Sequence, residues 1–137
     1  MYKRQAWRRL EKREGPILKS PESTDEELHE ARIATRRARF AIESVAAQLG
    51  EPVEGQARAV VVELIELQDV LGRHQDAVVA VRETITALNE HPGHEELAYA
   101  AGRMAEREMS AARDERQRLR RTWAATRAQR PKAWKKR

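Results

Sequence analysis

VVVELIELQDVLGRHQDAVVAVRETITAL, residues 60–88, carries a row of side chains that step along the chain by four and three positions without a break. The row consists of Val60, Leu64, Leu67, Leu71, His74, Val78, Val81, Ile85 and Leu88, and every member except His74 is apolar. Such a heptad seam is typical of a long helix that packs nearly antiparallel against other helices. We therefore predict a helix from about Gly55 to Asn89 in a left-handed four-helix bundle.

Three further helices are predicted around this one. They are expected over residues 3–14, from about residue 25 to residue 49, and from about residue 94 to residue 129. Gly15-Pro16 should end the first, overlapping capping boxes in residues 23–27 should start the second, and Gly50 should cap its end. The short connections favour an up-down-up-down order, so we expect an all-α fold that is an antiparallel four-helix bundle.

Size and composition limit the functions that the chain can have. At 137 residues it is expected to form a single domain, with a basic tail over residues 130–137 that could be disordered. The absence of cysteine excludes disulfides, thiol chemistry and cysteine zinc sites, and the four histidines are too dispersed for a metal motif. No stretch resembles a signal peptide or a membrane span, so we expect a soluble, cytoplasmic protein.

The net charge of +5 is distributed unevenly along the sequence. Residues 51–100 contain ten acidic residues against three arginines, whereas residues 115–137 contain ten basic residues against one acidic residue. Residues 1–13 add six basic residues against Glu11. A surface that is merely solvated would mix the two signs, so this separation indicates a positive surface that faces an anionic partner.

The stretch LHEARIATRRARF, residues 28–40, places a row of cations on one side of the predicted second helix. With 3.6 residues per turn, the row consists of His29, Arg32, Arg36 and Arg39, with Arg37 at its flank. Like charges at this spacing repel each other, and residues 31–42 contain no acid that could neutralise them. Neutralisation must then come from another helix, from solvent ions or from a bound polyanion.

Two explanations of this row stand at the level of sequence. In the first, the arginines are solvated or paired with acids of the third helix, namely Glu63, Glu66, Asp69 and Asp76. In the second, they bind an extended anion, because a guanidinium matches phosphate oxygens bidentately and keeps its charge. Further basic rows favour the second and could extend the surface; they are Arg4, Arg8 and Lys12 on the first helix, and Arg113, Arg116, Arg120 and Arg127 on the fourth.

Two motifs give the chain a resemblance to a known family. LHEARIATRRARFAIE (28–43) resembles the signature of CHAD domains, the conserved-histidine α-helical domains, and LQDVLGRHQDAVVA (67–80) resembles the second motif of that family. AWRRL (6–10) and WAATRAQRPKAW (123–134) resemble the segments that flank these motifs. Phe40 stands where the family often has tyrosine.

The resemblance implies an all-helical, non-catalytic protein that binds inorganic polyphosphate through basic side chains, in the cytoplasm or at polyphosphate granules. Full CHAD domains contain two four-helix halves, and this chain is similar to the second half alone. It would then be a fragment, a natural short form, or one of two copies that pair as a homodimer. The family's basic positions fall on His29, Arg32, Arg36, Arg37 and Arg39; with Arg4, Arg8, Lys12, Arg116 and Arg120 they make up the expected polyphosphate-binding residues.

Other functions have weaker support in the sequence. A nucleic-acid binder would also use basic rows, but we find no helix-turn-helix spacing and few aromatic residues for base stacking. An enzyme acting on polyphosphate would need a glycine-rich phosphate loop or clustered carboxylates for Mg²⁺, and neither is present in the sequence. A structural bundle that binds another protein through its heptad seam is the third alternative. We expect no cofactor and no metal, and we expect His74, in the apolar seam, to be a hydrogen-bonded core histidine near Asp76 or Gln68.

Overall fold

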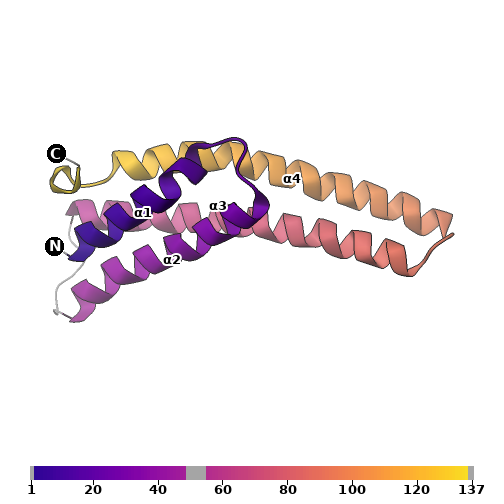
Figure 1. The fold of residues 1–137 in the computed structure, drawn as a ribbon, viewed down its shortest axis with the longest axis horizontal. Coiled ribbons are helices and arrows are strands. Elements are labelled where there is room, and N and C mark those ends of the chain that lie inside the picture. Colours follow the sequence, from indigo (N-terminus) through magenta and orange to yellow (C-terminus); the bar gives the residue numbers. More distant parts are fainter. Residues whose placement is uncertain (1, 49–54, 136–137) are drawn as a thin grey trace.

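The computed structural model describes residues 2–48 and 55–135, and these residues form four long helices and one short one (Figure 1). The helices are α1 (Tyr2–Lys19), α2 (Asp25–Gln48), α3 (Gly55–Glu90), α4 (Glu95–Ala128) and the 3-10 helix η1 (Lys132–Trp134). No strand occurs among the described residues. The predicted all-α four-helix bundle is therefore confirmed.

The four long helices form a ring in which each contacts two neighbours. Helix α1 packs against α2 and α4, and α3 packs against the other sides of α2 and α4. As a result, the seam between α2 and α3 lies on the opposite side of the bundle from the seam between α1 and α4. Both described chain ends lie at the end of the bundle away from the α3–α4 turn (Figure 1).

The predicted helix boundaries are confirmed for α3 and α4 but not for α1. The His94 Nδ1 atom accepts a hydrogen bond of 3.2 Å from the Leu97 amide and so caps α4. At the start of α2, Thr24 and Glu27 form the expected reciprocal capping box, with hydrogen bonds of 2.9 and 3.1 Å. The predicted end of α2 at Leu49 and Gly50 lies outside the described residues.

The prediction that α1 ends at Gly15-Pro16 is wrong, because α1 continues to Lys19 with Pro16 inside it. Packing explains the difference. Leu18 is fully buried, and a Cβ placed on Gly15 would make an ordinary contact of 3.6 Å with the Trp123 ring, so this turn of α1 lies against α4. Tertiary contacts of this last turn outweigh the hydrogen bond that proline removes.

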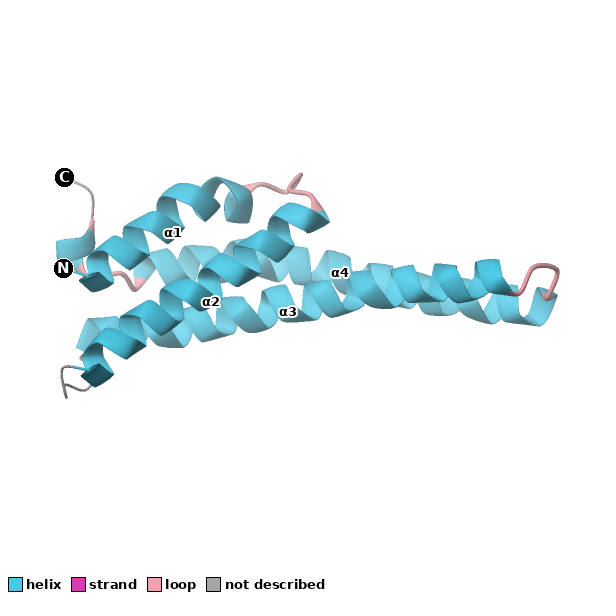
Figure 2. Cartoon of the chain, turned by 60° about the horizontal axis from the view of Figure 1, so that its bottom comes forward, coloured by secondary structure: helices cyan, strands magenta, loops and turns pink. Residues whose placement is uncertain are grey.

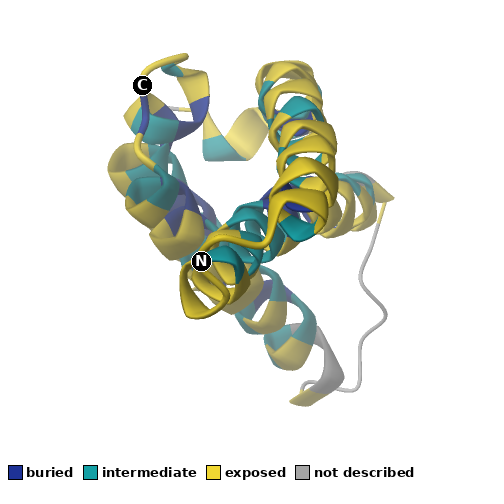
Figure 3. Ribbon diagram, turned by 90° about the vertical axis from the view of Figure 1, so that its right-hand side faces the viewer, coloured by how far each residue is buried: buried dark blue, intermediate teal, exposed yellow. Residues whose placement is uncertain are grey.

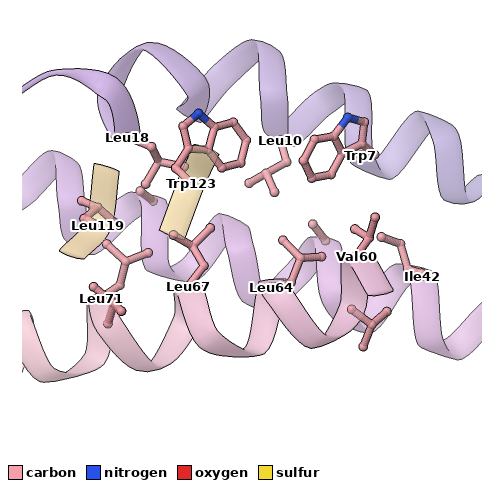
Figure 4. Packing of buried hydrophobic residues seen from close by; sticks show 14 of the residues in the cluster. Trp7, Leu10, Leu18, Ile42, Val60, Leu64, Leu67, Leu71, Leu119 and Trp123 are labelled. Atoms are coloured by element: carbon pink, nitrogen blue, oxygen red, sulfur yellow. The ribbon is translucent and has the colours of Figure 1, made fainter. Parts of the chain in front are cut away.

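The core lies at the end of the bundle where all four helices are present (Figure 4). Trp7 of α1 and Trp123 of α4 stack with their ring centroids 5.6 Å apart, and the first half of the heptad seam packs beneath them. The buried members of the seam are Val60, Leu64, Leu67, Leu71 and His74. Trp134 of the basic tail is half-buried against this cluster.

Beyond the core, α3 and α4 extend as an antiparallel pair that α1 and α2 do not cover (Figures 1 and 2). We call residues 76–112 the hairpin arm. Every residue of the arm is described, and only Ala77 and Ala101 are buried. Seen from the end of the arm, the ribbon carries mainly exposed and half-buried residues (Figure 3). The expectation that the whole heptad seam is core is therefore wrong for its second half.

His74 is buried in the core, as predicted, but its Nε2 atom makes none of the expected hydrogen bonds, and its neighbour is different from those expected. Its Nε2 atom lies 3.5 Å from Oδ1 of Asp25, at the start of α2, and Asp25 also pairs with Arg116 of α4 at 2.8 Å. Burial lowers the pKa of the His74 imidazole, and the Arg116 guanidinium lowers it further, against the opposing effects of the Asp25 and Glu115 carboxylates. His74 is therefore neutral at neutral pH.

This environment predicts that the bundle loses stability in mild acid. Because the pKa of His74 is lower in the folded state than in the unfolded chain, its contribution is complete above the unfolded value of about 6.5 and decreases as pH falls through the folded value. The melting temperature of the native chain should therefore decrease between pH 8 and pH 5 more steeply than that of His74→Gln, which cannot titrate there. Parallel curves for the two proteins would contradict the assignment.

Candidate functional site

The row predicted on the second helix lies along the seam between α2 and α3. We call His29, Arg32, Arg36 and Arg39 the α2/α3 basic surface. Arg32 is half-buried, and its guanidinium lies over Gly72 of α3, where a Cβ would be 3.7 Å from its Nε and Nη2 atoms. The Arg32 guanidinium thus lies against the surface of α3 at ordinary van der Waals distance.

An aromatic ring and an amide position the other two arginines of this surface. The guanidinium carbons of Arg36 and Arg39 lie 5.3 and 5.0 Å from the centroid of the exposed Phe40 ring. Arg39 also donates a 3.1 Å hydrogen bond to Oε1 of Gln68 and lies 3.7 Å from Glu43. Glu43, which follows the acid-free stretch 31–42 on the same helix, therefore pairs with Arg39.

The remaining cations of the row have no acidic partner within the described part of the chain. No carboxylate oxygen of residues 2–48 or 55–135 lies within 4.0 Å of Arg32 or Arg36. Of the acids on α3 that were considered as partners, Glu66 pairs with Arg73 instead, at 3.7 Å. Direct pairing with the acidic third helix is therefore not what neutralises Arg32 and Arg36.

Arg37 is directed to the other side of α2 and lines a groove between α1 and α2 of about 580 Å³. Arg9 and Arg13 line the same groove, together with Glu14 and Glu30. Burial raises the pKa of the Glu14 carboxyl, and the Glu30 carboxylate raises it further. Because acids and bases alternate around an apolar floor, this groove is less suited to a polyanion than the α2/α3 basic surface.

The basic rows on α1 and α4 do not extend the row on α2. Arg127 of α4 lies 3.8 Å from Glu11 of α1, which places Arg127 at the α1–α4 seam, opposite the α2/α3 basic surface. The predicted residues Arg4 and Arg8 are half-buried, and Lys12 and Arg120 are exposed. The ring order of the helices separates the predicted cations into distinct surfaces.

Arg116, another predicted phosphate ligand, is engaged within the fold. Its guanidinium donates to the backbone oxygen of Ser23 at 2.7 Å and to the carboxylate of Asp25 at 2.8 Å. It therefore joins α4 to the start of α2, more than ninety positions earlier in the chain. These contacts favour a structural role for Arg116, and we leave it out of the proposed binding surface.

Two contacts near the row were not anticipated from the sequence. Phe40 follows Arg36 by four positions and Arg39 by one, a spacing that could have indicated the cation–π contacts. Glu115 is buried and accepts hydrogen bonds from Arg73 at 3.1 Å and Arg118 at 2.7 Å, so it joins α3 to α4. Glu115 follows the buried Ala101 by fourteen positions and precedes the buried Leu119 by four, and this helical spacing is the signal that the acid faces inward.

Other kinds of site find no support in the described residues. No three histidine or acidic side chains among residues 2–48 and 55–135 gather closely enough to hold a metal ion. None of the helices in this part of the chain combines the length and the apolar character needed to cross a bilayer. The α2/α3 basic surface is thus the best-defined candidate site.

Comparison with known families identifies the architecture. The family model of the CHAD domain matches residues 3–86. The chain belongs to the CHAD domain family. The matched range contains α1, α2, most of α3 and both motifs noted in the sequence, whereas α4 and the tail segment 123–134 lie outside it. No curated protein and no solved structure matches the chain significantly.

The two motifs that resemble the CHAD family lie on neighbouring helices, α2 and α3. Residues 28–43 form the middle of α2, and residues 67–80 belong to α3, which packs against it. The first motif supplies the cations of the α2/α3 basic surface. The second supplies Gln68 and Gly72, which contact Arg39 and Arg32. The motifs therefore meet at one seam of this CHAD bundle.

Proposed function

We propose that this chain is a non-catalytic module that binds inorganic polyphosphate on the α2/α3 basic surface. The observation that carries the proposal is that Arg32 and Arg36 have no carboxylate within 4.0 Å among the described residues. The Arg32 guanidinium lies against Gly72 of α3, and the Arg36 guanidinium lies over the Phe40 ring of α2. Membership in the CHAD family supports the same ligand.

The spacing of the cations suits a linear anion. His29, Arg32, Arg36 and Arg39 span eleven residues of α2, whose ten steps of 1.5 Å make about 15 Å. A single small anion would reach one or two of these side chains, whereas a chain of phosphates could contact them in succession. A guanidinium can donate two hydrogen bonds to one phosphate, and His29 could add a further donor when protonated.

Calorimetric titration with long-chain polyphosphate, next to RNA of equal total charge, tests this function at physiological salt. We expect binding to polyphosphate that is tighter than binding to RNA and that weakens steeply as salt increases, by analogy with other polyanions. Equal affinity for both would indicate a general polyanion surface, and preference for RNA would indicate a nucleic-acid module. Absence of binding to either would overturn the proposal.

Localisation follows from the same proposal. A binding module without catalytic activity would attach itself, or a protein joined to it, to cytoplasmic polyphosphate. A fluorescent fusion should then concentrate at polyphosphate granules and become diffuse in cells that cannot make polyphosphate. A fusion that stays at the same position in both kinds of cell would contradict the localisation.

A further inference from the structure

The hairpin arm exposes an apolar face that continues the covered face of the bundle. On α3, Leu64 and Leu71 are fully buried in the core cluster to which α1 and α2 also contribute, while Val78 and Ile85 continue the same seven-residue repeat in the arm. Val78 is half-buried, and Ile85 is 50% exposed. Positions seven apart lie on the same face of a helix. The apolar seven-residue repeat thus continues along the whole of α3, but other helices cover it only in its first half.

Helix α4 shows the same change along one face. Trp123 stacks on Trp7 of α1, and Arg116 contacts the start of α2, so these positions mark the face of α4 that is turned toward α1 and α2. Met109, seven positions before Arg116, lies on this face in the arm and is 44% exposed. The uncovered surface therefore extends over both helices of the arm.

We propose that this face of the hairpin arm is a homodimer interface, in which the arms of two copies pack antiparallel into an intermolecular four-helix bundle. The seam in the first half of α3 is covered by a pair of helices, and a second arm is also a pair of helices with a heptad seam. Because the exposed half of the seam continues the covered half, the arm of a second copy is the partner that we infer for it. The proposal does not depend on polyphosphate binding.

Charge favours the antiparallel arrangement of the two arms. Residues 83–102, at the tip of the arm, contain four acidic residues and no lysine or arginine. Residues 113–121, just beyond the base of the arm, contain five arginines against two acidic residues, and Arg120 and Arg121 among them pair with no described carboxylate. An antiparallel pair places each acidic tip beside the basic region of the other copy, whereas a parallel pair would bring the two acidic tips together.

The size of the arm sets the expected strength of the dimer. Residues 76–90 of α3 rise about 22 Å, and two helices side by side are about 20 Å wide. Two such faces in contact would bury on the order of 1,000 Å² in total, near the lower limit for specific interfaces. We therefore expect a dimer that dissociates on dilution through the micromolar range.

Sedimentation equilibrium of the whole chain without polyanion, over a concentration series, measures this association. We expect a monomer–dimer equilibrium that Met109→Glu and Ile85→Glu each weaken at least tenfold. Met104→Glu is the matched control, because Met104 is on the same helix, is 59% exposed and lies about 140° around the helix from Met109. The three residues are exposed, so each variant should retain the melting temperature of the monomer.

Each outcome decides the proposal. A monomer at all concentrations, or equal dissociation by Met104→Glu and Met109→Glu, would overturn it. Spin labels at His91→Cys, in the turn of the arm, test the arrangement separately: the antiparallel dimer separates the two labels by at least the overlap of about 22 Å, whereas a parallel dimer brings them together. Failure of the polyphosphate titration would leave these results unchanged, so the two proposals fail independently.

Discussion

Replacing Arg32 and Arg36 together with alanine is expected to weaken polyphosphate binding by about tenfold or more without unfolding the bundle. An exposed ion pair contributes up to about 1 kcal/mol, and bidentate hydrogen bonds from a guanidinium to phosphate add to this. Neither arginine forms an ion pair with a described residue, so the fold loses little when they are removed. Calorimetry gives the affinity, and thermal unfolding gives the stability of each variant.

The salt dependence provides a second measure of the same contacts. If each arginine neutralises one phosphate, the slope of the logarithm of the binding constant against the logarithm of salt concentration should become shallower by about one for each arginine removed. Arg32→Lys keeps the charge but loses the planar fork. It should therefore retain most of the slope while losing part of the affinity.

The matched control for this double variant is Arg103→Ala with Arg107→Ala. These two arginines also lie four positions apart, are exposed, and are on the hairpin arm away from the α2/α3 basic surface. Both double variants change the net charge equally. Equal loss of binding in the two would show that affinity follows net charge alone, and loss of stability instead of binding in Arg32→Ala/Arg36→Ala would show that these arginines are structural.

Helical periodicity predicted which residues share a helix face more reliably than it predicted which other helix packs against that face. The heptad seam of α3 correctly identified Leu64 and Leu71 as core residues, and the capping boxes in residues 23–27 correctly identified the start of α2. The exposure of Ile85 could not be predicted from the seam, because it depends on α1 and α2 being shorter than α3 and α4.

The same limit applies to the candidate site. The row on α2 was correctly identified as one surface because its members share a helix face, whereas its separation from Arg8 on α1 depends on the order in which the helices surround the core. Arg116 was grouped with exposed cations because its partner, Asp25, is remote in sequence. Local pattern thus identifies a helix face, and contacts between distant segments determine which of its charges remain available to a ligand.

Removing either tryptophan of the Trp7–Trp123 stack should have the largest effect on stability of any single change in the chain. Both rings are almost completely buried between α1 and α4, and replacement of a buried tryptophan by alanine typically costs about 3–5 kcal/mol. A small domain has a total stability of about 5–15 kcal/mol, so Trp123→Ala should remove a large part of it. Urea unfolding followed by circular dichroism measures this loss.

A double-mutant cycle separates the stack from simple burial. Trp7→Ala, Trp123→Ala and the double variant should give a coupling energy of about 0.5–1.5 kcal/mol, the range for aromatic pairs in contact. Trp134→Ala is the control, because this half-buried tryptophan of η1 packs at the margin of the core and should contribute much less. A loss for Trp134→Ala as large as that for Trp123→Ala would contradict the placement of the core between α1 and α4. If the losses in free energy of unfolding for Trp7→Ala and Trp123→Ala simply add up in the double variant, the coupling energy is zero. Each ring would then stabilise the bundle through its other neighbours and not through the stack.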